Sequence, residues 1–405
     1  MTTGPATSSV GRNRRVIVSV MLSTSLGVMP YFFLGAFGPD IQASLGLSEV
    51  WFGTIVAGYF VGTILFSFPA GHLGDVRGPI WTISVAALGV AASLTGIALA
   101  RNGLQLALAV FVGGLANTFT QPGGNAALSR ALPPERLGRA FALKQSSIPV
   151  AAMIAGLAVS TVGAGIGWRW TIALIALLGG LVLASARATP RGGDGLPREV
   201  IRRASGSLRQ LAPLAAAGAC GSAATTGMVA FFVDSAIRGG VSKGTAGIWF
   251  AVGGVGGVVG RLLAGWIADR RFGRADIAWT LAVFWVLGAV GFILLALADS
   301  WPLRVLASFP TFIFGWGWNG MIHHATVQWN PSTPSWATGV TQTGMSIGGS
   351  IGPIVFGAVL GVASFRLAWV SSAAFMSLAA LLVSLARRRT EANGGSLTGS
   401  AVSGS

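Results

Sequence analysis

Stretches of about 20 mostly apolar residues recur along the whole chain, with only short polar breaks between them. This is the length of helix that spans a bilayer. The pattern therefore predicts an all-α membrane protein with twelve transmembrane helices. The predicted spans are residues 16–37, 51–74, 79–100, 104–128, 139–163, 168–187, 210–236, 245–268, 276–297, 302–327, 337–362 and 366–386.

Composition excludes a soluble protein. Apolar residues make up 53% of the 405-residue chain and charged residues only 9%, which is too few charges for a water-exposed surface. The formal net charge of +16 would indicate nucleic-acid binding in a soluble protein. Here the position of the basic residues decides what this charge means.

The basic residues are concentrated on one side of the predicted membrane. With the N-terminus inside, 19 Lys and Arg residues lie in cytoplasmic segments and 6 in outer loops, and Lys144 and Arg261 lie within spans. The positive-inside rule then places both termini in the cytoplasm, and nucleic acid is not an expected partner. Only two of the 27 basic residues are lysines, which is typical of a GC-rich bacterial genome. We therefore expect a multi-pass protein of a bacterial cytoplasmic (inner) membrane.

The sequence pattern indicates an internal duplication. A long polar segment rich in Pro and Gly divides six spans from six. We predict a cytoplasmic tail at 1–15, a six-helix bundle at 16–187, a linker at 188–209, a second bundle at 210–386 and a tail at 387–405. The repeat pairs are Asp40 with Asp234, Gly53 with Gly247, Asp75 with Asp269, Asn117 with Asn319, Gln145 with Gln342, and Arg169 with Arg366. Such pseudo-symmetric bundles place a substrate site at their interface near the middle of the membrane.

A short charged motif separates the second and third spans and returns between the eighth and ninth. Its first copy has Gly71, Asp75, Arg77 and Gly78, and its second begins at Gly265. We interpret the glycines as sites of close helix contact, and the aspartates as partners for a helix N-terminus and for arginine. The predicted gate residues are Gly71, Asp75, Arg77, Gly78, Gly265, Asp269 and Arg270.

This motif resembles that of the major facilitator superfamily, and the resemblance covers all twelve spans. Val76 and Pro79 depart from the family pattern, because each stands where a basic residue is usual. The resemblance implies alternating access between two rocking bundles. It also implies that Asp75 and Arg77 stabilise the outward-facing form.

Ionisable groups within spans are costly, so each is a candidate functional residue. Lys144 either faces the central cavity, as an anchor for an anionic substrate or as a group whose charge changes with the transport cycle, or its stem reaches the cytoplasmic surface about one turn away. Asp234 is interpreted as structural because its repeat partner, Asp40, lies at an outer helix end. Arg261 is interpreted as structural through pairing with a carboxylate on the cytoplasmic side.

Uncharged polar groups recur at matched places in both halves. Pairs spaced four residues apart, and so on one helical face, occur in the fourth and tenth spans, and glutamines match in the fifth and eleventh. These groups either bind a polar ligand in the cavity or form interhelical hydrogen bonds. The predicted substrate site comprises Lys144, Gln145, Asn117, Gln121, Asn319, His323 and Gln342.

The sequence offers no catalytic or metal chemistry. His323 and His324 are adjacent, so on a helix they point about 100° apart and cannot chelate one metal. Cys220 is the single cysteine. We predict a monomer that is not an enzyme and has no cofactor beyond a proton or ion gradient, with the lipid bilayer and a small, anionic molecule as its partners.

These features predict a secondary active transporter that works by alternating access, in proton-coupled uptake of a small organic anion or polar metabolite. The alternative is proton-driven efflux of drugs or metabolites. The fifth span lacks the Gly-Pro-rich pattern of the family's proton antiporters, which favours uptake. A third interpretation is a sensor or scaffold that transports nothing.

Overall fold

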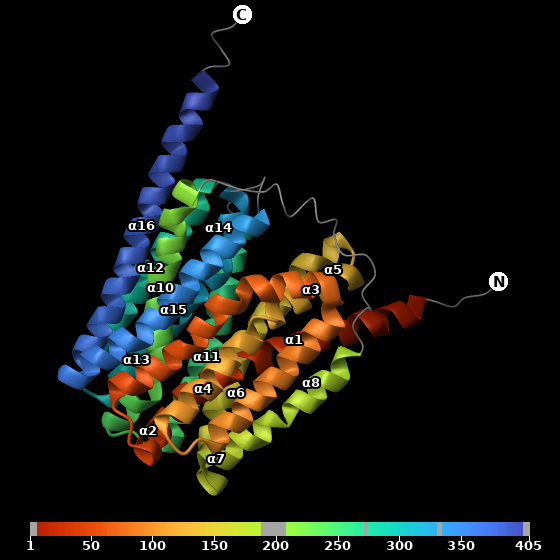
Figure 1. Cartoon of the computed structure of the whole chain (residues 1–405). Coiled ribbons are helices and arrows are strands. Elements are labelled where there is room, and N and C mark those ends of the chain that lie inside the picture. The colour runs from red at the N-terminus through yellow and green to blue at the C-terminus, as the bar shows by residue number, and fades with distance from the viewer. Residues whose placement is uncertain (1–5, 188–207, 271–273, 330–333, 400–405) are drawn as a thin grey trace, which may run out of the picture.

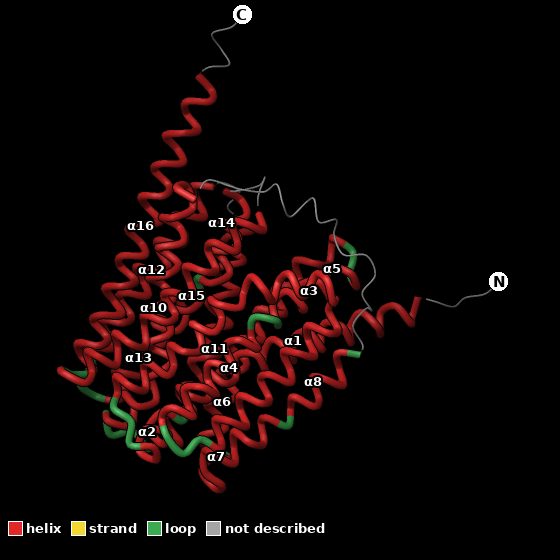
Figure 2. The backbone as a smooth tube through the Cα atoms, in the orientation of Figure 1, coloured by secondary structure: helices red, strands yellow, loops and turns green. Residues whose placement is uncertain are grey.

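The structure is a computed structural model that describes residues 6–187, 208–270, 274–329 and 334–399. Almost all of these residues are helical (Figures 1 and 2). The first half contains α1 (Ala6–Ala36), α2 (Gly38–Leu45), α3 (Glu49–Leu99), α4 (Gly103–Asn117), α5 (Thr120–Ala131), α6 (Pro134–Ser160), α7 (Val162–Ala176) and α8 (Leu178–Ala186). The second contains α10 (Leu208–Arg238), α11 (Lys243–Arg270), α12 (Arg274–Leu297), α13 (Trp301–Gly317), α14 (Asn319–Trp329), α15 (Pro334–Val362) and α16 (Phe365–Gly399). The predicted linker at 188–209 lies almost wholly outside the described residues.

Eleven spans in the described residues are long and apolar enough to cross a membrane. The predicted tenth span is divided between α13 and α14, each too short to cross alone, and together they make the twelfth crossing. The fold is thus the predicted all-α arrangement of two pseudo-symmetric six-helix bundles. One apolar core with buried residues from both halves holds it together.

The second and third spans, which share the label α3, are two helices that meet at Gly78, with a shorter connection than the expected loop. The kink lies at Gly78, whose φ of 81° and ψ of 173° are not helical. Glycine adopts a positive φ at little cost because it has no Cβ. Pro79 follows directly, and proline suits the start of the next helical segment because its missing N–H would be unpaired there. A basic residue at 79 would not supply this local geometry.

The fourth and tenth spans are each broken at corresponding places. The breaks lie at residues 118–119, between α4 and α5, and at residue 318, between α13 and α14. At the first break, the N–H groups of Thr118 and Phe119 donate to carbonyls three residues back, at 3.2 Å each. This is the tighter spacing of a 3₁₀ turn. Both broken spans therefore consist of two segments that meet in the membrane.

The start of α1 and the end of α16 lie at one end of the bundle, where α5, α8 and α14 also end (Figure 1). We call this the termini end, and we call the opposite end, which carries α2, the far end. The two halves diverge toward the termini end in Figure 1. They are joined toward the far end, where α3 packs on α15 and α6 on α11.

Two glycines that are repeat partners lie at these two helix crossings. Gly53 of α3 faces the carbonyl oxygen of Pro353 in α15, and a Cβ at Gly53 would collide with it. Gly247 of α11 faces the carbonyl oxygen of Gly156 in α6, and a Cβ there would lie 2.6 Å from that oxygen. Helices that cross this closely need small residues at the contact. The internal repeat thus supplies each of these two crossings with a glycine.

Candidate functional site

Lys144 is buried in the middle of the first half, with a set of amide oxygens around its ammonium group. Its Nζ donates to Gln121 Oε1 at 2.6 Å and to Asn125 Oδ1 at 2.5 Å. A longer contact of 3.4 Å reaches the backbone oxygen of Gln121. Gln121 and Asn125 are one turn apart on α5, so one helical face presents both amides to Lys144. We call these three residues the lysine cluster.

The burial of the lysine cluster bears on one of the two sequence interpretations of Lys144. Its residue exposure is 1%, so the interpretation in which its stem reaches the surface is wrong. Amides complete its hydrogen bonds, but they carry no charge to balance the ammonium. Taking an unbalanced charge out of water is costly, and proteins place such groups where function needs them. Asn125 is exposed and therefore marks the side from which another molecule can reach the cluster.

Arg261 joins the lysine cluster from the other half. Its Nη1 donates at 2.7 Å to the backbone oxygen of Gln145, the residue after Lys144, and its guanidinium lies 5.7 Å from the centre of the Trp316 ring. Trp316 in turn packs against Phe32 of α1. The observed partner of Arg261 is thus a carbonyl across the interface and not the expected carboxylate.

Two polar atoms beside these cations have no hydrogen-bond partner among the described residues: Gln145 Oε1 and His323 Nδ1. Both are buried. His323 lies within electrostatic reach of Lys144 and of Arg261. The site therefore combines two cations with open hydrogen-bonding capacity, which suits a polar ligand.

The other predicted site residues are less closely joined. Asn117 is the last residue of α4, and its Oδ1 accepts a bond from Thr120 Oγ1 at 3.1 Å across the helix break. The break also means that Asn117 and Gln121 do not share the face of one continuous helix. Asn319 and Gln342 are partly buried on α14 and α15, and no contact among the described residues joins them to the lysine cluster. Asn125 was missed, although its position four residues after Gln121 is a usable signal.

The predicted gate is described only in part. Gly71, Asp75, Asp269 and Arg270 lie in α3 and α11, but their side-chain surroundings are outside the described residues. Arg77 is exposed, and its guanidinium lies 5.6 Å from the Trp81 ring centre. Gly78 forms the kink of α3. Gly265 is exposed and a Cβ there would meet nothing within 4 Å, so its expected role as a close helix contact is wrong in this structure.

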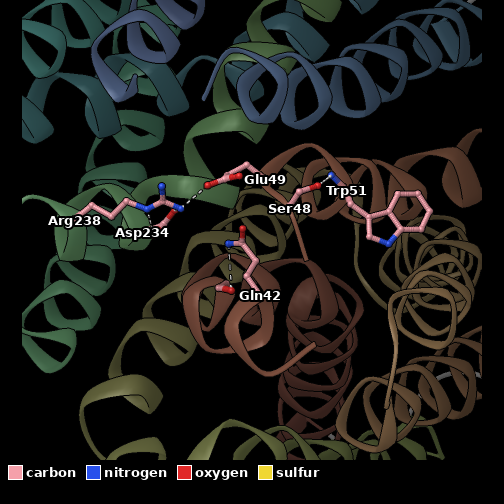
Figure 3. Close-up of polar contacts among 7 residues, drawn as sticks. Gln42, Ser48, Glu49, Trp51, Asp234 and Arg238 are labelled. Atoms are coloured by element: carbon pink, nitrogen blue, oxygen red, sulfur yellow. Dashed lines mark hydrogen bonds and ion pairs between the residues drawn. The ribbon is translucent and has the colours of Figure 1, made fainter. Parts of the chain in front are cut away.

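Ion pairs close the far end, and two of them cross between the halves. Lys243 at the start of α11 lies 2.7 Å from an Asp40 oxygen in α2. Arg238 at the end of α10 donates to Glu49 at 2.9 Å and to Asp234 at 3.0 Å (Figure 3). We call these five residues the far-end lock. Asp40 and Asp234 are repeat partners, and their location at helix ends agrees with the structural interpretation. The opposite charges in the neighbouring loops could have predicted these ion pairs from the sequence.

We expect the Asp40–Lys243 pair to bias the conformation and to affect stability little. Both side chains are about one-third exposed, and such pairs contribute at most about 1 kcal/mol. Asp40→Asn should therefore raise the population open at the far end by up to about fivefold. Single-molecule fluorescence between dyes on the two halves at the far end measures this. Asp299→Asn breaks a pair that lies within the second half, Asp299 with Arg366, and should leave the distribution unchanged. An equal shift in both variants would contradict the assignment.

A duplicated helical bundle that is closed by ion pairs at one end and holds polar and charged groups at its middle has the architecture of a secondary transporter. A family model described as Major Facilitator Superfamily matches residues 20–330. The chain therefore belongs to this superfamily of transporters, which are not enzymes.

The chloramphenicol resistance protein of Streptomyces lividans is 25% identical over 373 residues, covering 87% of this chain and 91% of that protein. The fold also matches solved transporters. A bacterial homologue of the human lysosomal transporter Spinster, in an inward-facing and unoccupied conformation, gives a TM-score of 0.77 at 18% identity, covering 93% of this chain and 97% of that one. A D-xylose-proton symporter gives 0.75 at 14% identity, covering 91% and 96%. At these identities the likeness concerns the fold.

Proposed function

We propose that the chain takes up a small organic anion or anionic polar metabolite together with protons, by alternating access. One observation carries this proposal: a lysine that is 1% exposed donates to neutral amides, and none of the ion pairs among the described side chains includes it. An anionic group on the substrate supplies the missing negative charge. The amides of the lysine cluster orient Lys144 toward it.

The need for protons follows from electrostatics. A bacterial membrane is negative inside, so an anion that enters alone moves against the potential at a cost of about 2.3 kcal/mol per charge and 100 mV. Protons that enter with the anion cancel this charge. A proton gradient can then drive its accumulation.

The loop charges support an orientation with both termini in the cytoplasm of a bacterial cell, in the cytoplasmic (inner) membrane. In that orientation the far end faces outward, and a closed far-end lock corresponds to an inward-facing carrier. We expect a monomer, with the linker at 188–209 between the two bundles.

Transport by purified protein in proteoliposomes tests the proposal. Small carboxylates and neutral analogues of the same size are compared, with and without a pH gradient that is acid outside. We expect the carboxylates to accumulate and the gradient to stimulate their uptake. Uptake of the neutral analogues at the same rate would show that charge is not what the site selects.

Efflux is the second candidate, and the similarity to the chloramphenicol resistance protein favours it. Cells that express this chain would then survive higher chloramphenicol concentrations than cells without it. Proton-driven export exchanges an entering proton for the leaving compound, so a medium that is acid outside should stimulate loss of the compound from loaded vesicles against its gradient. Resistance without anion uptake would replace the first proposal by the second.

A further inference from the structure

Two cations from opposite halves lie near each other at the interface between the halves. Lys144 is in α6 of the first half, and Arg261 is in α11 of the second. The Arg261 guanidinium binds the backbone oxygen of the residue that follows Lys144, at 2.7 Å. Both cations lie within electrostatic reach of His323. The site therefore holds two positive charges, one from each bundle.

In the sequence, no acidic residue lies in the middle of a predicted span. Its eleven Asp and Glu residues lie toward helix ends or between and beyond the spans: Asp40, Glu49, Asp234 and Asp299 on far-end segments, Asp75, Glu135, Asp269 and Asp276 toward the other end, and Asp194, Glu199 and Glu391 outside the spans. Asp269 is eight residues from Arg261 along α11, which is about 12 Å at 1.5 Å per residue. The ion pairs among the described side chains include neither cation.

Arg261 has more hydrogen-bond donors than it uses among the described residues. A guanidinium carries five N–H donors in a planar fork. Among the described residues, Arg261 makes one hydrogen bond, through Nη1, and one contact with the Trp316 ring. As a whole residue, Arg261 is only partly buried. The fork geometry favours two oxygens of one carboxylate or phosphate group.

We infer that Arg261 is a second substrate-binding residue and that the transported substrate carries two negative charges, as in a dicarboxylate or a phosphate monoester. This inference rests on the proposed function, because it assigns the substrate class of the same site. One anionic group binds Lys144 and the other binds Arg261. A dianion thus contacts both bundles, whereas a monoanion balances only one cation.

Binding measurements on the purified, full-length protein test this inference. The probes are dicarboxylates from malonate to glutarate, their monomethyl esters as monoanions of similar size, and ethyl phosphate, each titrated by calorimetry. We expect at least one dianion to bind about tenfold or more tightly than its monoester, the effect of one charge-assisted contact. Comparing the affinity for ethyl phosphate with the affinities for the dicarboxylates shows which of the two kinds of dianion the site prefers. In Arg261→Gln, the ratio of dianion affinity to monoester affinity should fall to about twofold, with monoester binding nearly unchanged. Arg261→Lys keeps the charge and should retain part of the preference.

Lys144→Gln should weaken the binding of dianions and monoesters alike, because an anionic group of each binds Lys144. If anions bind but the wild type does not prefer dianions, the inference is overturned while the proposed function stands. If Arg261→Gln folds and keeps the preference, Arg261 is not the second contact. If no anion of either kind binds, the proposed function itself fails.

Discussion

Lys144→Gln should abolish transport, lowering the initial rate by about 100-fold or more, because it removes the charge that attracts the anion and leaves the site geometry intact. A glutamine can still donate to Gln121 and Asn125, so their amide oxygens keep a partner. The melting temperature should therefore change by only a few degrees. The fourteen tryptophans allow unfolding to be followed by intrinsic fluorescence.

Two further variants make this experiment specific. Lys144→Arg keeps a cation on α6 and should retain measurable transport with a changed substrate preference, because guanidinium binds as a planar fork and not as a point charge. Arg101→Gln removes an exposed cation of the same half and should transport at the wild-type rate. Wild-type rates for Lys144→Gln would show that the amides, and not the charge, recognise the substrate.

Gly247→Ala should open the far end. A Cβ at this position would lie 2.6 Å from the Gly156 carbonyl oxygen and 2.8 Å from Val159 Cβ, so α11 must move away from α6. Gly53→Ala should have the same effect at the crossing of α3 with α15. We expect the distribution of distances across the far end to shift to longer values, and a loss of about 1–3 kcal/mol in the stability of the closed form.

Spin labels at Ala43→Cys and Thr245→Cys, in a Cys220→Ser background, report this distance on the two halves by electron paramagnetic resonance. The matched controls are Gly244→Ala on α11 and Gly58→Ala on α3, where a Cβ would meet nothing within 4 Å. In a helix, Ala is preferred to Gly by about 1 kcal/mol, so these controls should be slightly more stable and keep short distances. Unchanged distances in both Gly247→Ala and Gly53→Ala would refute the role of the crossings.

The architecture could be predicted from the sequence because membrane spans are long, apolar and repeated. Local breaks could not be predicted in the same way. The fourth and tenth spans read as continuous because their apolar runs continue through residues 118–119 and 318, and a one-turn change of backbone spacing leaves no mark on hydropathy. The kink at Gly78 was hidden for a related reason, since Gly-Pro at 78–79 is compatible with a loop as well as with a bend.

The site was predicted in part. Lys144 and Gln121 were identified because polar residues within spans are rare and costly, and the structure joins them. Arg261 was assigned the wrong partner, because sequence spacing favours carboxylates on the same helix and carries no information on a carbonyl of another helix. The far-end lock was missed because its members are separated by up to about 200 positions, and charges in loops have many possible partners.

The breaks in the fourth and tenth spans have a mechanical consequence. Gln121 and Asn125 lie beyond the first break, on α5, and His323 lies beyond the second, on α14. We expect these breaks to bend more easily than continuous helix, so that α5 and α14 can tilt relative to α4 and α13. A substrate held by both segments would draw them inward and become occluded before the two bundles reorient. Occlusion by local bending would thus precede the rocking of whole halves.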